Sequence, residues 1–165
     1  MSLRVEIAVE SAGWDETPDL SAHVGRAIAA ARRLADVTTA PAAEVSLLFT
    51  DDAHIRQLNA QWRGQDKPTN VLSFPGAGEI ETAPLLGDIA LAFETTAREA
   101  REQGKPLADH VAHLVVHGFL HLVGYDHKTD GEAEEMEALE RAILKHMGVP
   151  DPYAGTSPAN EPTEP

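Results

Sequence analysis

The chain has 165 residues, of which 42% are hydrophobic, and this is the size of one ordinary domain with a buried core. It contains no cysteine, which excludes disulfides and thiolate metal sites, and no apolar run as long as a membrane span. Its net charge of −14 argues against non-specific binding to nucleic acid, which depends on clustered cations. We therefore expect a single cytoplasmic domain that does not contact membranes.

The first half of the chain alternates between strand-like and helix-like patterns. Residues 3–9 alternate polar and apolar side chains, as a half-buried strand does, and a turn-rich loop follows them. Residues 20–36 are rich in alanine and arginine with helical periodicity, and residues 44–50 are typical of a buried strand. An aspartate at 51 or 52 then caps a helix whose apolar stripe we expect in the core: Ile55, Leu58 and Trp62.

A loop with two cations, Arg63 and Lys67, follows this helix and leads into a short strand over residues 70–74. Solvated charge is the plain interpretation of both cations. However, loops between rigid elements often carry functional side chains, so both are kept as candidates.

The second half predicts one more strand and three helices. Residues 85–93 are strand-like, residues 94–103 form a charged helix, and a break at 104–106 precedes a histidine-rich helix. The acids of the last helix, residues 130–147, crowd its first turns, which suits the helix dipole rather than a binding site. Residues 150–165 contain five prolines, which predicts a disordered tail.

The histidine-rich helix ends in the motif HGFLHLVGYDH. His117 and His121 are four residues apart and therefore lie on one helix face, one turn apart. Gly124 is the residue type that ends a helix in the left-handed conformation, so the chain can turn back and bring His127 to the same place. Three imidazoles with an open fourth position are typical of a catalytic zinc site.

Two further histidines compete for this role. His110 and His113 lie on the same side of the predicted helix, within an arc of roughly 80°. A ligand set taken from one helix alone would spread along the helix axis. We therefore predict that His117, His121 and His127 bind one metal ion per chain.

The spacing of these histidines also matches the H-E-x-x-H-x-x-G-x-x-H motif of the metzincin proteases. Gly118 stands where those enzymes have their glutamate general base. The sequence thus predicts a metzincin-like zinc helix without the proton acceptor of a protease.

Three blocks of the chain resemble one family, the YbeY endoribonucleases of bacterial rRNA maturation. Residues 117–127 are similar to its signature H-G-x-L-H-L-x-G-Y-D-H. Residues 58–75 resemble its L-N-x-x-[YFW]-R-G-x-D-K-P-T-[DN]-V-L-S-F-P block, and LLGDIAL resembles its L-G-D-I strand. The resemblance covers residues 58–147, while the first 50 residues fit by their predicted elements only.

The resemblance implies an α+β fold, with a small mixed four-stranded sheet flanked by about five helices, over a single domain of residues 1–149. It implies a zinc ion on the three histidines and a single-strand-specific, metal-dependent endoribonuclease. The implied role is 16S rRNA 3′-end maturation and ribosome quality control, with rRNA, the small ribosomal subunit and ribosome-associated proteins as partners and no DNA substrate. The important arginine of the family falls on Arg63.

Elementary chemistry is compatible with that function. Zinc with an open position lowers the pKa of bound water or polarises a phosphoryl oxygen. The planar fork of Arg63 suits the non-bridging oxygens of a phosphodiester, and Lys67 is a weaker candidate for a phosphate contact. Asp88 and Asp126 are candidates for carboxylates that orient a ligand imidazole.

Two alternatives stay open at this point. One is a peptidase-like zinc hydrolase, against which Gly118 argues unless a carboxylate from elsewhere serves as the base. The other is a non-enzymatic ribosome-assembly factor in which zinc is structural, and only the state of the fourth coordination position separates it from an enzyme.

Overall fold

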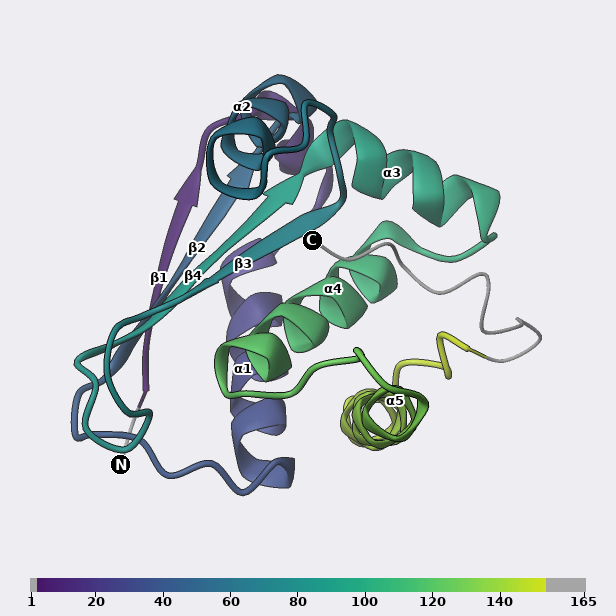
Figure 1. Cartoon of the computed structure of the whole chain (residues 1–165). Helices are drawn as coiled ribbons and strands as arrows, with labels where there is room; N and C mark the ends of the chain where they lie inside the picture. Colours follow the sequence, from purple (N-terminus) through teal and green to yellow (C-terminus); the bar gives the residue numbers. More distant parts are fainter. Residues whose placement is uncertain (1–2, 154–165) are drawn as a thin grey trace.

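A computed structural model describes residues 3–153 of the chain (Figure 1). Its sheet has four strands in the order β1-β2-β4-β3. Strands β1, β2 and β4 run parallel, and β3 pairs antiparallel with β4. The expected mixed four-stranded sheet is therefore confirmed, with these bounds: β1 Arg4–Val9, β2 Glu44–Thr50, β3 Val71–Pro75 and β4 Leu85–Ala92.

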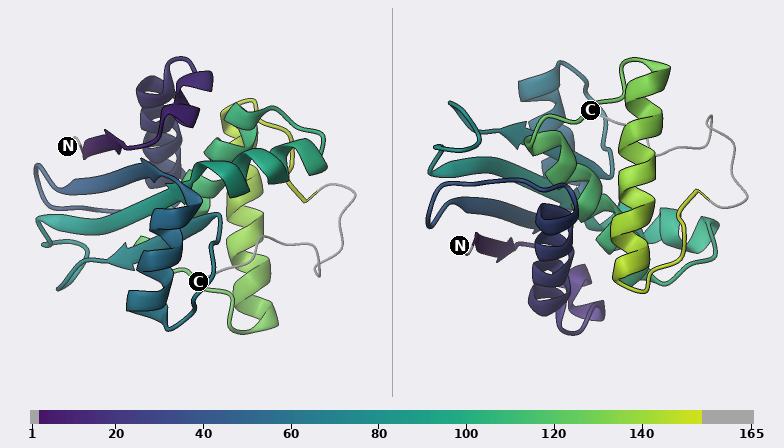
Figure 2. Two further views of the ribbon diagram at one scale, coloured as in Figure 1. Left: turned by 90° about the horizontal axis from the view of Figure 1, so that it is seen from above. Right: turned by 90° about the horizontal axis from the view of Figure 1, so that it is seen from below.

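Five α-helices surround the sheet, as expected. Helices α1 and α4 lie against one face, and α5 packs outside them, as the two views of Figure 2 show. Helix α2 lies over one end of the opposite face. The bounds are α1 Leu20–Leu34, α2 Asp52–Arg63, α3 Phe93–Glu102, α4 Leu107–Leu122 and α5 Asp130–His146.

Helix α4 is the centre of the molecule. It contacts β3, β4, α1, α3 and α5, so it has a partner on almost every side. An interior helix can be apolar all round, and every residue from 110 to 120 is buried here. The histidines of this helix therefore lie in the core, where each polar nitrogen needs a partner.

The alternation along the strands divides the remaining core into two unequal parts. Val45, Leu47 and Phe49 of β2 face the large core under α1 and α4. Ile55 of α2 covers a smaller cluster on the opposite face. Beyond α2 this opposite face carries an open groove of about 590 Å³, lined by Trp62 and Asp88 among others.

Trp62 corrects the expectation of a buried apolar stripe along α2. Trp62 is 62% exposed, and its ring contacts the Phe74 ring edge-on, with 6.4 Å between the two ring centroids. Ile55 is fully buried and Leu58 is partly buried. Burial decreases along the stripe because α2 covers only one end of the open sheet face (Figure 2).

Trp14 is a core residue that the periodicity did not reveal. It lies in a single 3-10 turn, η1 (Ala12–Glu16), within the predicted loop, and is only 1% exposed. Its indole N–H donates to the carbonyl of Thr50 at 2.9 Å, and its ring meets Phe49 and Phe93 edge-on. Burial of the ring thus leaves its polar group satisfied.

The predicted tail lies mostly outside the described residues, which end at Tyr153. The part before residue 154 returns to α5. Asp151 lies 3.5 Å from Arg141, whose guanidinium sits 5.3 Å from the ring centre of Tyr153. Among the described helices, none is long and apolar enough to cross a membrane.

Candidate metal site

The end of α4 brings the three predicted ligands together. His117 and His121 project from one side of its last turns. Gly124 has a φ of +105°, and the Tyr125 N–H donates to the Leu120 carbonyl at 2.9 Å, which ends the helix and turns the chain back. His127 then reaches the same place, so that one nitrogen of each of the three imidazoles lies within 4.8 Å of the others. This cluster can hold a metal ion.

Hydrogen bonds fix which nitrogen two of these rings present. His121 Nδ1 lies 3.0 Å from the Tyr125 carbonyl, and His117 Nδ1 lies 2.6 Å from Oε2 of Glu140. A carbonyl and a carboxylate can only accept, so both rings carry their proton on Nδ1 and keep the Nε2 lone pair for a ligand. Neutral imidazoles held in this way fit zinc, and also nickel, copper or iron.

The rival histidines are directed to carboxylates instead. His110 Nε2 lies 2.9 Å from Glu99, which also accepts from Asn70. His113 Nε2 lies 3.0 Å from Glu140. Burial lowers the pKa of both His110 and His113, so both rings are neutral near pH 7 and donate a proton to their partner. Their packing explains their presence without a metal.

Glu140 is the residue of this site that the sequence interpretation missed. It is fully buried on α5 and contacts two histidines of α4. Burial alone would raise the pKa of this carboxyl, but His117 and His113 outweigh it and hold the pKa well below its ordinary value. The crowding of acids in the first turns of α5 favours the helix dipole as their explanation. However, Glu140 falls on the stripe of buried Met136 and Ile143, and a charge on an apolar stripe was the available signal.

Asp126 and Asp88 differ in their relation to the site. Asp126 accepts the backbone N–H of His127 at 2.8 Å, and this bond lowers its pKa. It therefore shapes the loop that carries a ligand. Asp88 lines the groove on the opposite face of the sheet, so it cannot orient a ligand imidazole. Burial, and then the charge of Glu44, raise the pKa of Asp88.

Gly118 faces the sheet rather than the metal cluster. A Cβ at this position would lie 3.0 Å from Ile89 and 3.2 Å from the hydroxyl of Ser73. The Ser73 hydroxyl also donates to the Gly118 carbonyl at 3.4 Å. The glycine between the first two ligands therefore allows α4 to approach β3 and β4 closely.

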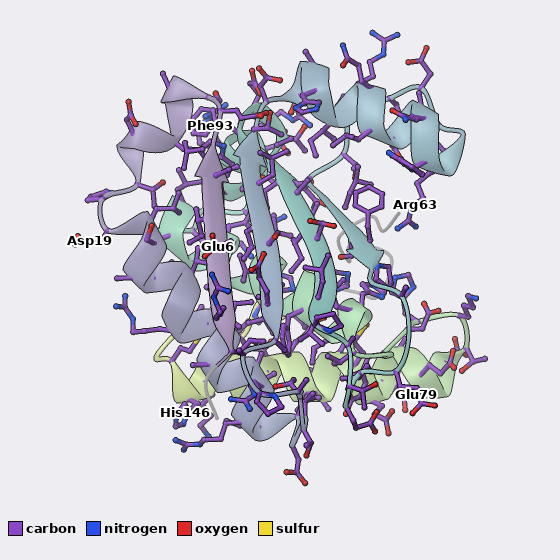
Figure 3. All side chains as sticks on the ribbon, turned by 90° about the vertical axis from the view of Figure 1, so that its left-hand side faces the viewer. Glu6, Asp19, Arg63, Glu79, Phe93 and His146 are labelled. Carbon is purple, nitrogen blue, oxygen red and sulfur yellow. The ribbon has the colours of Figure 1, made fainter. Side chains whose placement is uncertain are left out.

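Arg63 ends α2 and lies beside the β3 strand (Figure 3). Its guanidinium donates to the Ser73 carbonyl and sits 5.5 Å from the centre of the Phe74 ring. Arg63 is connected through Ser73 to Gly118, which lies between the two helical ligands. Arg63 is exposed, and its guanidinium has several N–H donors besides the one bonded to Ser73, so it can also bind an anion.

Lys67 lies in the exposed loop between α2 and β3. Asn59 of α2 donates its amide to the Lys67 carbonyl at 2.9 Å, which holds the backbone of this loop against the helix. The side chain is thus carried by an ordered loop, and its role as a phosphate contact stays a prediction.

A buried helix whose end presents three imidazoles, packed on a mixed sheet, is an arrangement that can hold a metal ion for hydrolytic chemistry. A family model described as Endoribonuclease YbeY matches residues 10–148. Named relatives carry the same description. One from Methylocella silvestris is 52% identical, over 90% of this chain and 85% of its own. One from Bradyrhizobium diazoefficiens is 56% identical, over 90% of this chain and 84% of its own.

A relative from Rhodopseudomonas palustris, also described as Endoribonuclease YbeY, is 53% identical over 94% of this chain and 93% of its own. The solution structure of TM1509 from Thermotoga maritima matches 97% of this chain and all of its own chain, with a TM-score of 0.55 and 22% identity, and supports the fold. The chain belongs to the YbeY endoribonuclease family.

Proposed function

We propose that this protein is a zinc-dependent, single-strand-specific endoribonuclease that acts in 16S rRNA 3′-end maturation and ribosome quality control. The observation that carries this proposal is the cluster of His117, His121 and His127 at the end of α4 in a chain of this family. The described relatives are named endoribonucleases, which supports RNA as the substrate class.

The residues of the chain have separable roles in this chemistry. The three histidines hold the metal ion, and the Tyr125 carbonyl and Glu140 keep two of the rings in the ligand tautomer. Zinc held by these histidines would supply Lewis acidity and would make a water molecule at the site more acidic. Arg63 binds the phosphoryl group bidentately and stabilises the charge that develops there, and Lys67 contacts a neighbouring phosphate.

The acidic surface bears on how the substrate arrives. A chain with a net charge of −14 attracts isolated RNA weakly. The small ribosomal subunit or a ribosome-associated protein therefore presents the rRNA, in the cytoplasm, to the few cations beside the site. DNA is not expected as a substrate.

The two alternatives fit these observations less well. A peptidase needs a general base, and position 118 points into the interface between α4 and the sheet. A purely structural zinc ordinarily has four protein ligands, whereas the cluster offers three histidines. Among the described residues, this ligand count supports an enzyme over a structural zinc protein.

The test compares four proteins, purified identically, on one rRNA fragment that spans the 16S 3′ end. Arg63→Ala should keep zinc and lose about 10²–10³-fold in rate, by analogy with removal of one oxyanion donor. His121→Ala should lose both zinc and activity. His110→Ala is the matched control, since it removes an imidazole of the same helix whose partner is Glu99, and it should keep both. Equal cleavage by all four proteins would identify a contaminating nuclease and end the proposal.

A further inference from the structure

We propose that Glu140 is a positioning residue for the metal, and that Tyr153 holds Glu140 in place. In this role Glu140 fixes the His117 imidazole with Nε2 toward the ion, and the segment after α5 becomes part of the metal site. The inference rests on the proposed metal site but not on RNA cleavage.

Three donors converge on the Glu140 carboxylate. His117 Nδ1 lies 2.6 Å from Oε2, His113 Nε2 lies 3.0 Å from Oε1, and the Tyr153 hydroxyl donates to Oε1 at 2.5 Å. The carboxylate is an acceptor only, so each neighbour must direct a proton to it. The result is one defined proton position on each imidazole, and on His117 it leaves Nε2 for the metal.

The burial of Glu140 needs an explanation of this kind. The residue is 0% exposed and shares its face of α5 with Met136, Ile143 and Leu144. Burying a charge is unfavourable, and an apolar residue at such a position often gives equal or higher stability. A role at the adjacent ligand accounts for a charge that stability alone does not require. Carboxylates that receive the second N–H of a metal-bound imidazole also make that ligand more basic.

Tyr153 connects this carboxylate to the end of the described chain. Besides its bond to Glu140, its ring packs edge-on against His113 at 5.5 Å between centroids. The Arg141 guanidinium lies over the Tyr153 ring, 5.3 Å from its centre, and also pairs with Asp151. Tyr153 is therefore held from two sides while it donates to Glu140.

The experiment measures zinc affinity by competition with a chromophoric chelator, together with the visible spectrum of the Co²⁺ form. Glu140→Gln keeps the shape of the side chain but removes its charge and one acceptor. It should bind zinc about 10–100-fold more weakly than the wild type and shift the Co²⁺ bands. Tyr153→Phe should also lower the affinity for zinc, but by a smaller factor than Glu140→Gln. Glu134→Gln, the same change at an exposed position of the same helix, should match the wild type.

The outcomes separate the two proposals. If the wild-type protein does not bind zinc, the proposed metal site itself is wrong. A wild type that binds zinc, with a folded Glu140→Gln variant within twofold of it and an unchanged Co²⁺ spectrum, overturns only the positioning role. If Glu140→Gln does not fold, Glu140→Asp decides, because it keeps the charge but is too short to reach His117 in the same geometry. Wild-type affinity in that variant also overturns the inference.

Discussion

Gly118 lies where α4 packs against β3 and β4, and this single residue excludes a protease base at the position where the metzincin motif has it. A Cβ here would lie 3.0 Å from Ile89, so any longer side chain must displace the side chains of β3 and β4. The sequence motif indicated that the base is missing. The structure adds that a glutamate at this position would point away from the metal cluster.

Gly118→Glu should therefore destabilise the protein without creating peptidase activity. An unpaired charge in this interface is expected to lower the free energy of unfolding by about 3–5 kcal/mol, measured by urea unfolding of the metal-free protein. Gly131→Glu is the control, because nothing lies within 4 Å of a Cβ there and a carboxylate suits the first turn of α5. A Gly118→Glu variant as stable as the control would contradict this account of the packing.

Asp88 gives a prediction about pH. Burial and the neighbouring Glu44 raise its pKa above the ordinary value of 3.8, so the folded state disfavours the ionised form. The penalty is complete above the raised pKa and disappears as the pH falls below 3.8, where Asp88 is protonated in both states. Asp88→Asn should raise the melting temperature at pH 7, and the gain over wild type should vanish in acid.

Asp66→Asn, in contrast, should lower the melting temperature at pH 7. The Arg56 guanidinium donates to Asp66 and lowers its pKa, so loss of this carboxylate removes a favourable pair. Calorimetry of both variants across the acid range provides the comparison. An Asp88→Asn variant that is less stable than wild type at pH 7 would show that the carboxylate has a favourable partner.

At the scale of elements, sequence periodicity predicted the helices and strands but not which neighbouring elements cover each of their faces. The predicted helix 20–36 is observed as Leu20–Leu34, and the predicted strand 44–50 as Glu44–Thr50. The η1 turn is too short to show a period, so the burial of Trp14 was not foreseen. An apolar stripe identifies one face of a helix but not the elements that cover this face. The prediction that Trp62 is buried was wrong for this reason.

The metal cluster illustrates the same limit. His117, His121 and His127 are close in sequence, and local helix geometry was enough to bring them together. The contact between His117 and Glu140 joins two helices, and only the packing of α5 on α4 creates it. The sequence carried a hint of it in the charge on the buried stripe, but nothing that identified the partner.

Residues 150–153, which follow α5, should contribute to the stability of the domain. Ending the chain after Val149 removes the hydroxyl that donates to Glu140 and the pairing of Arg141 with Asp151. Loss of a hydrogen bond to a charged group is expected to lower the free energy of unfolding by about 1.5–3 kcal/mol. Ending the chain after Tyr153 is the matched control, because it keeps both of these contacts, and it should melt at a higher temperature than the shorter chain. Equal melting temperatures for both truncations would show that these contacts contribute little.

At the scale of the whole molecule, 27 acids against 13 lysines and arginines repel the phosphate backbone. A protein that binds RNA through its general charge loses affinity steeply with salt, because each neutralised phosphate releases counterions. Here only a few placed cations can act in this way. Arg63 and His146, labelled in Figure 3, lie at opposite sides of the molecule, so cations at the end of α5 are remote from the proposed phosphate contacts.

The salt dependence of RNA binding can therefore test Lys67, the least supported of the proposed site residues. For single-stranded RNA, log K should fall against log salt concentration with a slope of about −0.7 per phosphate contact, or about −1.4 if Arg63 and Lys67 each make one. Lys67→Ala should bring the slope to about −0.7. Lys145→Ala changes the net charge equally at an exposed position near the end of α5 and should leave the slope unchanged.

The measurement is fluorescence anisotropy of one labelled rRNA fragment with the three proteins over a series of KCl concentrations. The comparison isolates a local contact, because both variants alter the overall repulsion by one charge. Identical slopes for Lys67→Ala and Lys145→Ala would remove Lys67 from the phosphate contacts. In that case Arg63 alone would have to bind the backbone, and the slope of the wild type should already be near −0.7.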